Sequence, residues 1–215
     1  MKNRGWIVTL AIIVGSQFGC VPAKSNSVRD PAQAPVPPPV ITIEVTTEQA
    51  LAAFTKLHVV ATGTRCTNCH VTGERPMQLE GIAKRFHNMN VQRKITELGH
   101  ACQTCHGERN LDKPHLPPGA PHWGMPGGRK AVTAGTSPKM LCELWLDPAR
   151  NDFETGENTG KGRTPAQMLE HVTNDPLVKW TWAPGPERTP SKGTHEEFVK
   201  NFATWVAGGT PCPAQ

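Results

Sequence analysis

The sequence predicts a mainly α, loop-rich fold. Four stretches begin with helix-capping residues, and no stretch shows the alternating pattern of a strand. Among the 215 residues are 20 Gly and 21 Pro, and aromatic residues make up only 6%. This composition is typical of long loops around a thin core. A thin core over this length usually depends on cross-links or a bound cofactor.

The first predicted helix covers about residues 47–60. Residues 46–49 (Thr-Thr-Glu-Gln) form a capping box, and apolar residues recur behind it at helical spacing. Residues 71–130 are predicted to be irregular, because Gly, Pro and polar residues interrupt every long period. One or two helical turns are expected within this region, near residues 90–98.

Three further helices are predicted in the C-terminal third. Ser137-Pro138 and Thr164-Pro165 each pair an N-cap residue with a proline at the first helical position. The helix after Thr164-Pro165 is expected to reach about Asn174. Residues 194–197 (Thr-His-Glu-Glu) form a capping box ahead of an apolar face that ends at Gly208-Gly209.

Residues 1–20 have the pattern of a bacterial export signal. Two basic residues precede an apolar stretch that is short for a membrane span. Gly19-Cys20 resembles the lipobox of lipoproteins, so Cys20 is the predicted lipidation site and the protein is expected to be periplasmic and lipid-anchored to the membrane. Ordinary cleavage after Ala23 and an uncleaved anchor helix are the alternatives.

The rest of the chain divides into a tether and a folded part. Residues 21–43 are rich in Pro, Ala, Ser and Val, which favours an extended polyproline conformation. Residues 44–215 form the predicted domain. The formal net charge is +5, but Lys and Arg are dispersed, which argues against a nucleic-acid partner. No hydrolase motif or phosphate-binding loop is present.

Two CxxCH motifs, residues 66–70 and residues 102–106, carry the chemistry. This spacing is typical of covalent haem c. Two thiols one helical turn apart add to the two vinyl groups, and the adjacent histidine binds the iron. Two haem c groups are therefore predicted as cofactors. The attachment residues are Cys66, Cys69, Cys102 and Cys105, with His70 and His106 as proximal ligands.

Two other interpretations of the motif cysteines exist. One is a zinc site with four thiolate ligands, which leaves both motif histidines unexplained and fits poorly with export. The other is a thioredoxin-like dithiol, which needs only one CxxC and a βαβ context that the sequence lacks. Cys142 and Cys212 remain outside the motifs. They are predicted to form a disulfide in an oxidising compartment, the alternative being two buried free thiols.

A sixth ligand on each iron would close it to substrate and favour electron transfer. His87 is the leading distal candidate, because it lies between the two motifs in an otherwise extended stretch, and Met125 in a proline-rich loop is a further one. Other distal candidates are His58, His100, His115, His122, Met77 and Met89. Candidate propionate partners are Arg75, Arg85 and Arg93, and candidates for haem walls or core are Trp123, Trp180, Trp182 and Trp205.

Several segments resemble a known family. Residues 87–93 (His-Asn-Met-Asn-Val-Gln-Arg), 117–123 (Pro-Pro-Gly-Ala-Pro-His-Trp) and 180–185 (Trp-Thr-Trp-Ala-Pro-Gly) are similar to segments of small two-haem cytochromes labelled cytochrome subunits of isoquinoline 1-oxidoreductase-type systems. The resemblance covers about residues 50–213. One departure is that residues 63–65 (Gly-Thr-Arg) stand where the family commonly has His-Pro-Arg.

The resemblance implies a cytochrome c-like two-haem domain with C-terminal helices, and it supports His87 as a haem ligand. It also implies an electron carrier, rather than an enzyme, that links a molybdenum hydroxylase to a respiratory acceptor. A small two-haem peroxidase with one open haem is the alternative function, and a haem-based sensing module is a third. The donor enzyme stays open, because such a label is an association and not a property of the site.

Overall fold

The computed structural model describes residues 44–72, 75–80, 84–87, 102–124, 132–151 and 162–215. Helix α1 (Thr47–Ala61) begins at the predicted capping box. The Thr46 hydroxyl accepts a hydrogen bond from the Gln49 N–H (3.2 Å), and the Gln49 side chain accepts one from the Thr46 N–H (2.8 Å). The prediction of a helix here is confirmed.

Helices α3 (Pro138–Leu146), α4 (Pro165–Asn174) and α6 (His195–Ala207) are the three predicted in the C-terminal third. Each begins with an N-cap hydroxyl that accepts a hydrogen bond from the backbone N–H three residues on, at 3.1–3.2 Å. Helix α6 ends at Gly208, as predicted. The N-cap residues therefore fix where these helices start.

Helix α5 (Pro176–Trp180) was not predicted. The Asp175 carboxylate caps it by accepting hydrogen bonds from the N–H groups of Leu177 (2.8 Å) and Val178 (3.3 Å). Five residues are too few to show a helical period, so only the cap could have indicated this helix. The helix ends at Trp180, which reaches the candidate site described below.

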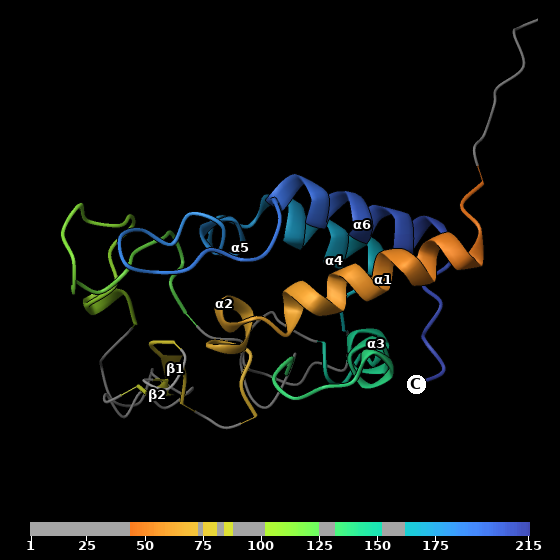
Figure 1. Cartoon of the computed structure of the whole chain (residues 1–215), viewed down its shortest axis with the longest axis horizontal. Coiled ribbons are helices and arrows are strands. Elements are labelled where there is room, and N and C mark those ends of the chain that lie inside the picture. Colours follow the sequence, from red (N-terminus) through yellow and green to blue (C-terminus); the bar gives the residue numbers. More distant parts are fainter. Residues whose placement is uncertain (1–43, 73–74, 81–83, 88–101, 125–131, 152–161) are drawn as a thin grey trace, which may run out of the picture. The chain divides into compact units, whose positions relative to one another are not determined.

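An aromatic cluster forms the centre of the core, where α1 packs along α6 and α3 packs against α1 (Figure 1). The Phe54 ring lies 5.1 Å from the Trp205 ring and 5.7 Å from the Trp145 ring, measured between centroids. Phe54 and Trp205 are both fully buried. The other core side chains are Leu57, Ala61, Leu141, Cys142, Met168, Phe198 and Phe202.

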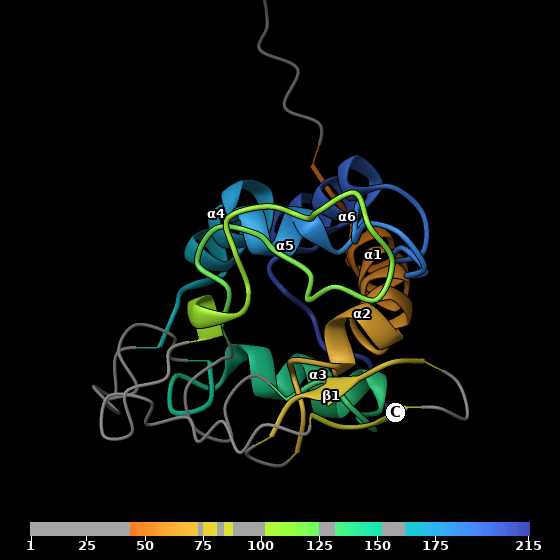
Figure 2. The same ribbon diagram turned by 90° about the vertical axis from the view of Figure 1, so that its left-hand side faces the viewer.

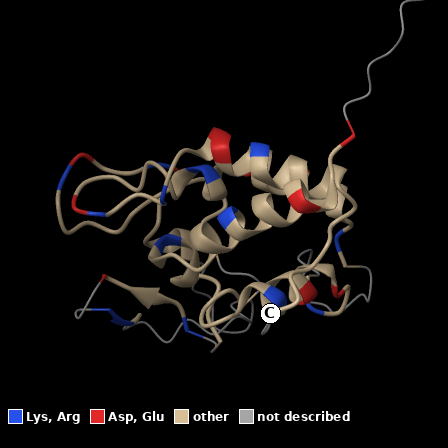
Figure 3. Cartoon of the chain, turned by 45° about the vertical axis from the view of Figure 1, so that its right-hand side comes forward, with Lys and Arg blue, Asp and Glu red and all other residues tan. Residues whose placement is uncertain are grey.

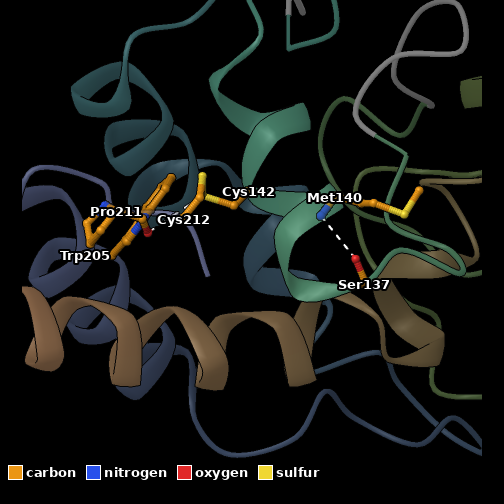
Figure 4. Close-up of a disulfide and its surroundings, with 6 residues drawn as sticks. All are labelled: Ser137, Met140, Cys142, Trp205, Pro211 and Cys212. Atoms are coloured by element: carbon orange, nitrogen blue, oxygen red, sulfur yellow. Dashed lines mark hydrogen bonds between the residues drawn. A yellow bond between two sulfur atoms is a disulfide. The ribbon is translucent and has the colours of Figure 1, made fainter. Parts of the chain in front are cut away.

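A disulfide joins Cys142 in α3 to Cys212 beyond α6, the pairing expected from the sequence (Figure 4). The two Cα atoms are 5.5 Å apart, and Cys142 is fully buried. The Trp205 indole N–H donates to the Pro211 carbonyl oxygen (3.0 Å). The segment after α6 is thereby fixed to the core at two places.

The described residues also contain one short antiparallel hairpin, which was not predicted. Strand β1 (Met77–Gln78) pairs with β2 (Arg85–Phe86), with Met77 opposite Phe86. Two residues per strand are too few to show alternation in the sequence. The fold is therefore helix-rich and loop-rich, with this hairpin between the two CxxCH motifs.

Several predicted features lie outside the described residues: the export signal, the tether at 21–43, Cys20, Met89, Met125 and the expected turns near 90–98. All described residues belong to one compact unit, Thr42–Gln215. Among the described residues, no helix has the length and apolar character that a membrane span requires. In the view of Figure 3, basic and acidic residues are interspersed along the helices.

Candidate functional site

The first CxxCH motif begins in helix α2 (Thr64–Thr67), which follows α1 after a turn at Gly63. The His70 N–H donates to the Cys66 carbonyl oxygen (2.9 Å), and the Cys69 N–H donates to the same oxygen (3.1 Å). The backbone thus completes a helical turn between the two cysteines. This local geometry is the one that attachment of two vinyl groups requires.

The thiols of this motif are kept neutral. Burial raises the pKa of Cys66 to about 12, and the neighbouring Cys69 thiol adds to the effect. Burial also raises the pKa of Cys69 to about 11, against the effect of Arg65, and the Cys102 thiol of the second motif raises it further. The two motifs are therefore near enough for Cys69 and Cys102 to interact electrostatically.

A buried charge lies beside the first motif. Arg65 is only 7% exposed and forms an ion pair with Glu80, which also accepts a hydrogen bond from the Thr189 N–H (3.0 Å). The Arg65 Nε atom is buried and has no hydrogen-bond partner among the described residues. Lys84 donates to the Thr67 hydroxyl (3.0 Å). This side of the motif is rich in donors, which suits an anionic group.

The second CxxCH motif begins in a short 3₁₀ helix, η4 (Cys102–Thr104). The Cys102 carbonyl oxygen accepts hydrogen bonds from the N–H groups of Cys105 (3.2 Å) and His106 (3.0 Å). Cys105 is exposed, whereas Cys102 is half-buried. All four motif thiols are free.

The His106 ring is held on two sides. Its Nδ1 atom lies 2.7 Å from the Pro118 carbonyl oxygen, which can only accept, so Nδ1 carries the proton and donates. The Trp123 ring stacks on the imidazole with 4.5 Å between centroids and 3° between planes. Burial lowers the pKa of His106, and the Pro118 hydrogen bond opposes this only in part. The neutral ring therefore presents Nε2 as a metal ligand.

His87 lies across from His106. The two ring centroids are 6.2 Å apart, and the planes are inclined by 50°. An imidazole nitrogen binds a metal at about 2 Å and lies about 1 Å from its own ring centre, so two imidazoles on opposite sides of one iron have centres about 6 Å apart. The His87–His106 separation fits such a pair.

The hairpin places His87. Directly after β2, the His87 N–H donates to the Pro76 carbonyl oxygen (2.8 Å), and the His87 carbonyl oxygen accepts from the Arg75 guanidinium. Arg75 was a candidate partner for a propionate, the alternative being an exposed arginine, and in this structure its guanidinium supports the backbone of His87. Arg85 is exposed, and Arg93 lies outside the described residues.

The other described distal candidates are engaged elsewhere or exposed. The Nε2 atom of His58 lies 2.8 Å from the Thr136 carbonyl oxygen. His115 pairs with Glu187 at 3.2 Å on the surface, and His122 is exposed. Met77 pairs with Phe86 in the hairpin. His100 and Met125 lie outside the described residues. Of the described distal candidates, His87 is therefore the one whose ring lies next to a motif histidine, His106.

The loop between α5 and α6 forms hydrogen bonds to residues near both motifs. The Arg188 guanidinium donates to the Leu116 carbonyl oxygen (2.6 Å), and the next residue, Thr189, donates to Glu80 beside the first motif. Figures 1 and 2 show this loop between α5 and α6 beside residues 102–124. Sequence reasoning missed Arg188, because bonds to carbonyl oxygens leave no motif.

The donor set fits haem better than zinc. No three His, Cys, Asp or Glu side chains of the described residues come together in a group that could hold a metal ion, so the motif thiols do not form a four-cysteine cage. Haem would need fewer ligands from the protein, and the neighbouring rings of His87 and His106 could supply them. An open pocket of about 460 Å³ lies beside Cys105 and is lined in part by Leu111, which is 53% exposed. Glu108 and Arg109 also line this pocket, so it combines an apolar surface with charged groups beside a motif cysteine.

Comparisons with family models, with curated proteins and with solved structures give no match for this chain.

Proposed function

We propose that this protein is an electron carrier with two covalently attached haem c groups. The observation that carries the proposal is the pair of CxxCH motifs together with the His87 ring 6.2 Å from the His106 ring. A bound haem supplies a reversible one-electron iron centre. The residues of the chain would attach that centre and supply its ligands.

Each motif would hold one haem. Cys66 and Cys69 would form the thioether bonds of the first, with His70 as its proximal ligand. Cys102 and Cys105 would hold the second, with His106 as its proximal ligand. The protonated Nδ1 of His106 and its Pro118 partner leave Nε2 as the ligating atom, which is the arrangement that metal-bound histidines usually have.

His87 is the proposed distal ligand of the second haem. If His87 and His106 both bound the haem iron, no position would be left open for a substrate, which would favour transfer of electrons over catalysis. The neighbourhood of Cys69 and Cys102 suggests that the two haems lie close to each other. An electron could then enter at one haem and leave from the other.

The proposed setting is the periplasm, with the protein anchored to a membrane through a lipid on Cys20. The Cys142–Cys212 disulfide is consistent with an oxidising compartment. The proposed partners are a donor oxidoreductase, of the molybdenum hydroxylase class by family resemblance, and a respiratory acceptor. The protein itself would not act as an enzyme.

Magnetic circular dichroism of the purified haem-bearing protein tests the proposal. Two low-spin haems in both redox states are expected, with a bis-histidine signature for one of them. His87→Ala should make one haem high-spin, whereas His115→Ala, at an exposed histidine paired only with Glu187, should leave both spectra unchanged. A high-spin ferric haem in the unmodified protein that binds cyanide or peroxide rapidly would instead support a peroxidase.

A further inference from the structure

One asparagine joins three segments around the second motif. The Asn110 side-chain oxygen accepts hydrogen bonds from the Gly119 N–H (3.1 Å) and from the Trp180 indole N–H (3.0 Å). The Asn110 side-chain nitrogen donates to the Ala183 carbonyl oxygen (3.1 Å). A single amide group therefore connects the loop after the motif, the end of α5 and the loop beyond α5.

Two of the three segments that Asn110 holds, those of Gly119 and Trp180, also contact a group that holds His106. Gly119 directly follows Pro118, whose carbonyl oxygen accepts the His106 Nδ1 proton at 2.7 Å. The Trp180 ring meets the Trp123 ring edge to face, with 4.7 Å between centroids and 82° between planes, and Trp123 stacks on the His106 imidazole. Asn110 is therefore bonded to the residue after Pro118, which accepts from the His106 ring, and to Trp180, which packs on the Trp123 ring that stacks on His106.

Two glycines make room for this arrangement. A Cβ atom on Gly119 would lie 2.5 Å from the Gly107 carbonyl oxygen, and one on Gly185 would lie 2.9 Å from the Asn110 side-chain carbon. Gly185 also has a φ of +84°, in the left-handed region that favours glycine. Gly185 therefore lets the backbone approach the Asn110 amide, and Gly119 lets the loop after the motif pack on the backbone of residues 107–109.

We propose that Asn110 is a positioning residue for the proximal ligand of the second haem, acting through Pro118 on one side and through Trp180 and Trp123 on the other. The inference rests on the proposed function. A hydrogen bond from Nδ1 makes a ligating imidazole more basic, which favours ferric iron. Weakening the hydrogen bond from His106 Nδ1 to the Pro118 carbonyl oxygen should therefore raise the reduction potential of the second haem. The potential of the first haem should stay unchanged.

A spectroelectrochemical titration of the haem-bearing protein tests this, with the haem count of each variant established first by mass spectrometry. Asn110→Ala should shift one of the two reduction waves to a more positive potential, and that wave should be the one that His87→Ala also changes. Trp180→Phe keeps a ring against Trp123 but removes the indole N–H, so it should shift the same wave by less. Asn201→Ala is the matched control, because the Asn201 side-chain nitrogen donates to the Glu197 carbonyl oxygen within α6 (2.8 Å).

The outcomes separate the two proposals. Protein without haem on either motif contradicts the proposed function, whatever Asn110 does. If haem is present and Asn110→Ala lowers the melting temperature while both waves stay in place, Asn110 is merely structural and the inference is wrong. Equal shifts of both waves would contradict it as well. If Asn110→Ala does not fold, the Trp180→Phe variant provides the test. An unchanged reduction potential of the second haem in Trp180→Phe would then contradict the inference.

Discussion

The two CxxCH motifs have the same spacing but are held in different ways. The first continues from α1 through α2, and burial raises the pKa values of both its thiols, to about 12 and about 11. The second begins in a three-residue 3₁₀ helix, one of its thiols is exposed, and contacts between loops hold its histidine. The first motif takes its position from the helical core, whereas the second takes it from side-chain bonds to backbone carbonyl groups.

This difference indicates which substitutions should affect which haem. Substitutions in the helical core should destabilise the whole domain. They should also disturb the first motif, because it directly follows α1. Changes around His106 should cost less stability, because few fully buried side chains lie there, and should alter the second haem alone. The predictions that follow test this division, beginning with the largest expected effect.

Phe54→Ala tests the contribution of the helical core to stability. Phe54 is fully buried and contacts Trp145 and Trp205, so its loss should lower the free energy of unfolding by about 3–5 kcal/mol. Val59→Ala on the same helix is the control, because Val59 is 44% exposed and its loss should cost less than about 1 kcal/mol. Urea unfolding measures both. Equal effects of the two substitutions would show that α1 is not packed as described.

The disulfide gives the next largest effect. Replacing Cys142 and Cys212 together by Ser should lower the free energy of unfolding by about 2–5 kcal/mol, because the bond closes a long loop in the unfolded chain. The absorption spectrum of the second haem should stay unchanged, since its proposed ligands are held by other contacts. Met140→Ala, at an exposed residue of the same helix, serves as the control for thermal melting. A double variant as stable as the parent would show that the bond does not form.

On the loop side, Trp123→Leu removes the ring that stacks on His106. The stacking contributes about 0.5–1.5 kcal/mol beyond burial, and its loss should change the electron paramagnetic resonance signal of one haem only. Trp182→Leu is the matched variant, because the Trp182 ring packs on Phe198 and His195 instead. Trp182→Leu should lower stability and leave both haem signals in place. Identical spectra for the parent and Trp123→Leu would contradict the second motif's dependence on this ring.

The smallest effect, about 1 kcal/mol, is expected at the N-cap of α5. Burial raises the pKa of Asp175, but the ion pair with His171 and the N–H groups of Leu177 and Val178 outweigh it, so the net pKa is lowered. A lowered folded-state pKa means that the contribution is present above the unfolded-state value of about 3.9 and is lost as the pH falls below it.

Asp175→Ala should therefore be less stable than the parent at pH 7, and the difference should shrink below about pH 4. Thermal melting as a function of pH measures this. Glu143→Ala, at an exposed acid of α3, should show no such trend. A difference that persists unchanged into acid would mean that the carboxylate does not act as the cap.

The sequence predicted the helical part well, because its signals are local. Ser137, Thr164 and Thr194 each bond the backbone three residues on, so a short pattern is enough to place the helix start. Asp175 has the same role, but the helix behind it is too short to show a period. The hairpin of two-residue strands could not be predicted for the same reason.

From the sequence, the CxxCH spacing predicted the thiols and the two proximal histidines, and His87 was predicted from its place between the motifs and from family resemblance. The attachment of haem at these residues stays a prediction. That the His87 ring lies 6.2 Å from the His106 ring depends on the pairing of β1 with β2, which places the backbone directly before His87. The roles of Asn110 and Arg188 could not be predicted, because they bond carbonyl and N–H groups that every residue carries.

Mass spectrometry of peptides from the purified protein tests the central claim most directly. If both motifs attach haem, the peptide with Cys66 and Cys69 and the peptide with Cys102 and Cys105 should each gain the mass of one haem. The Cys142 and Cys212 peptides should stay linked to each other until they are reduced. If neither motif peptide gains this mass, and all four motif thiols react with an alkylating reagent, the protein does not carry haem c and the proposed function is wrong.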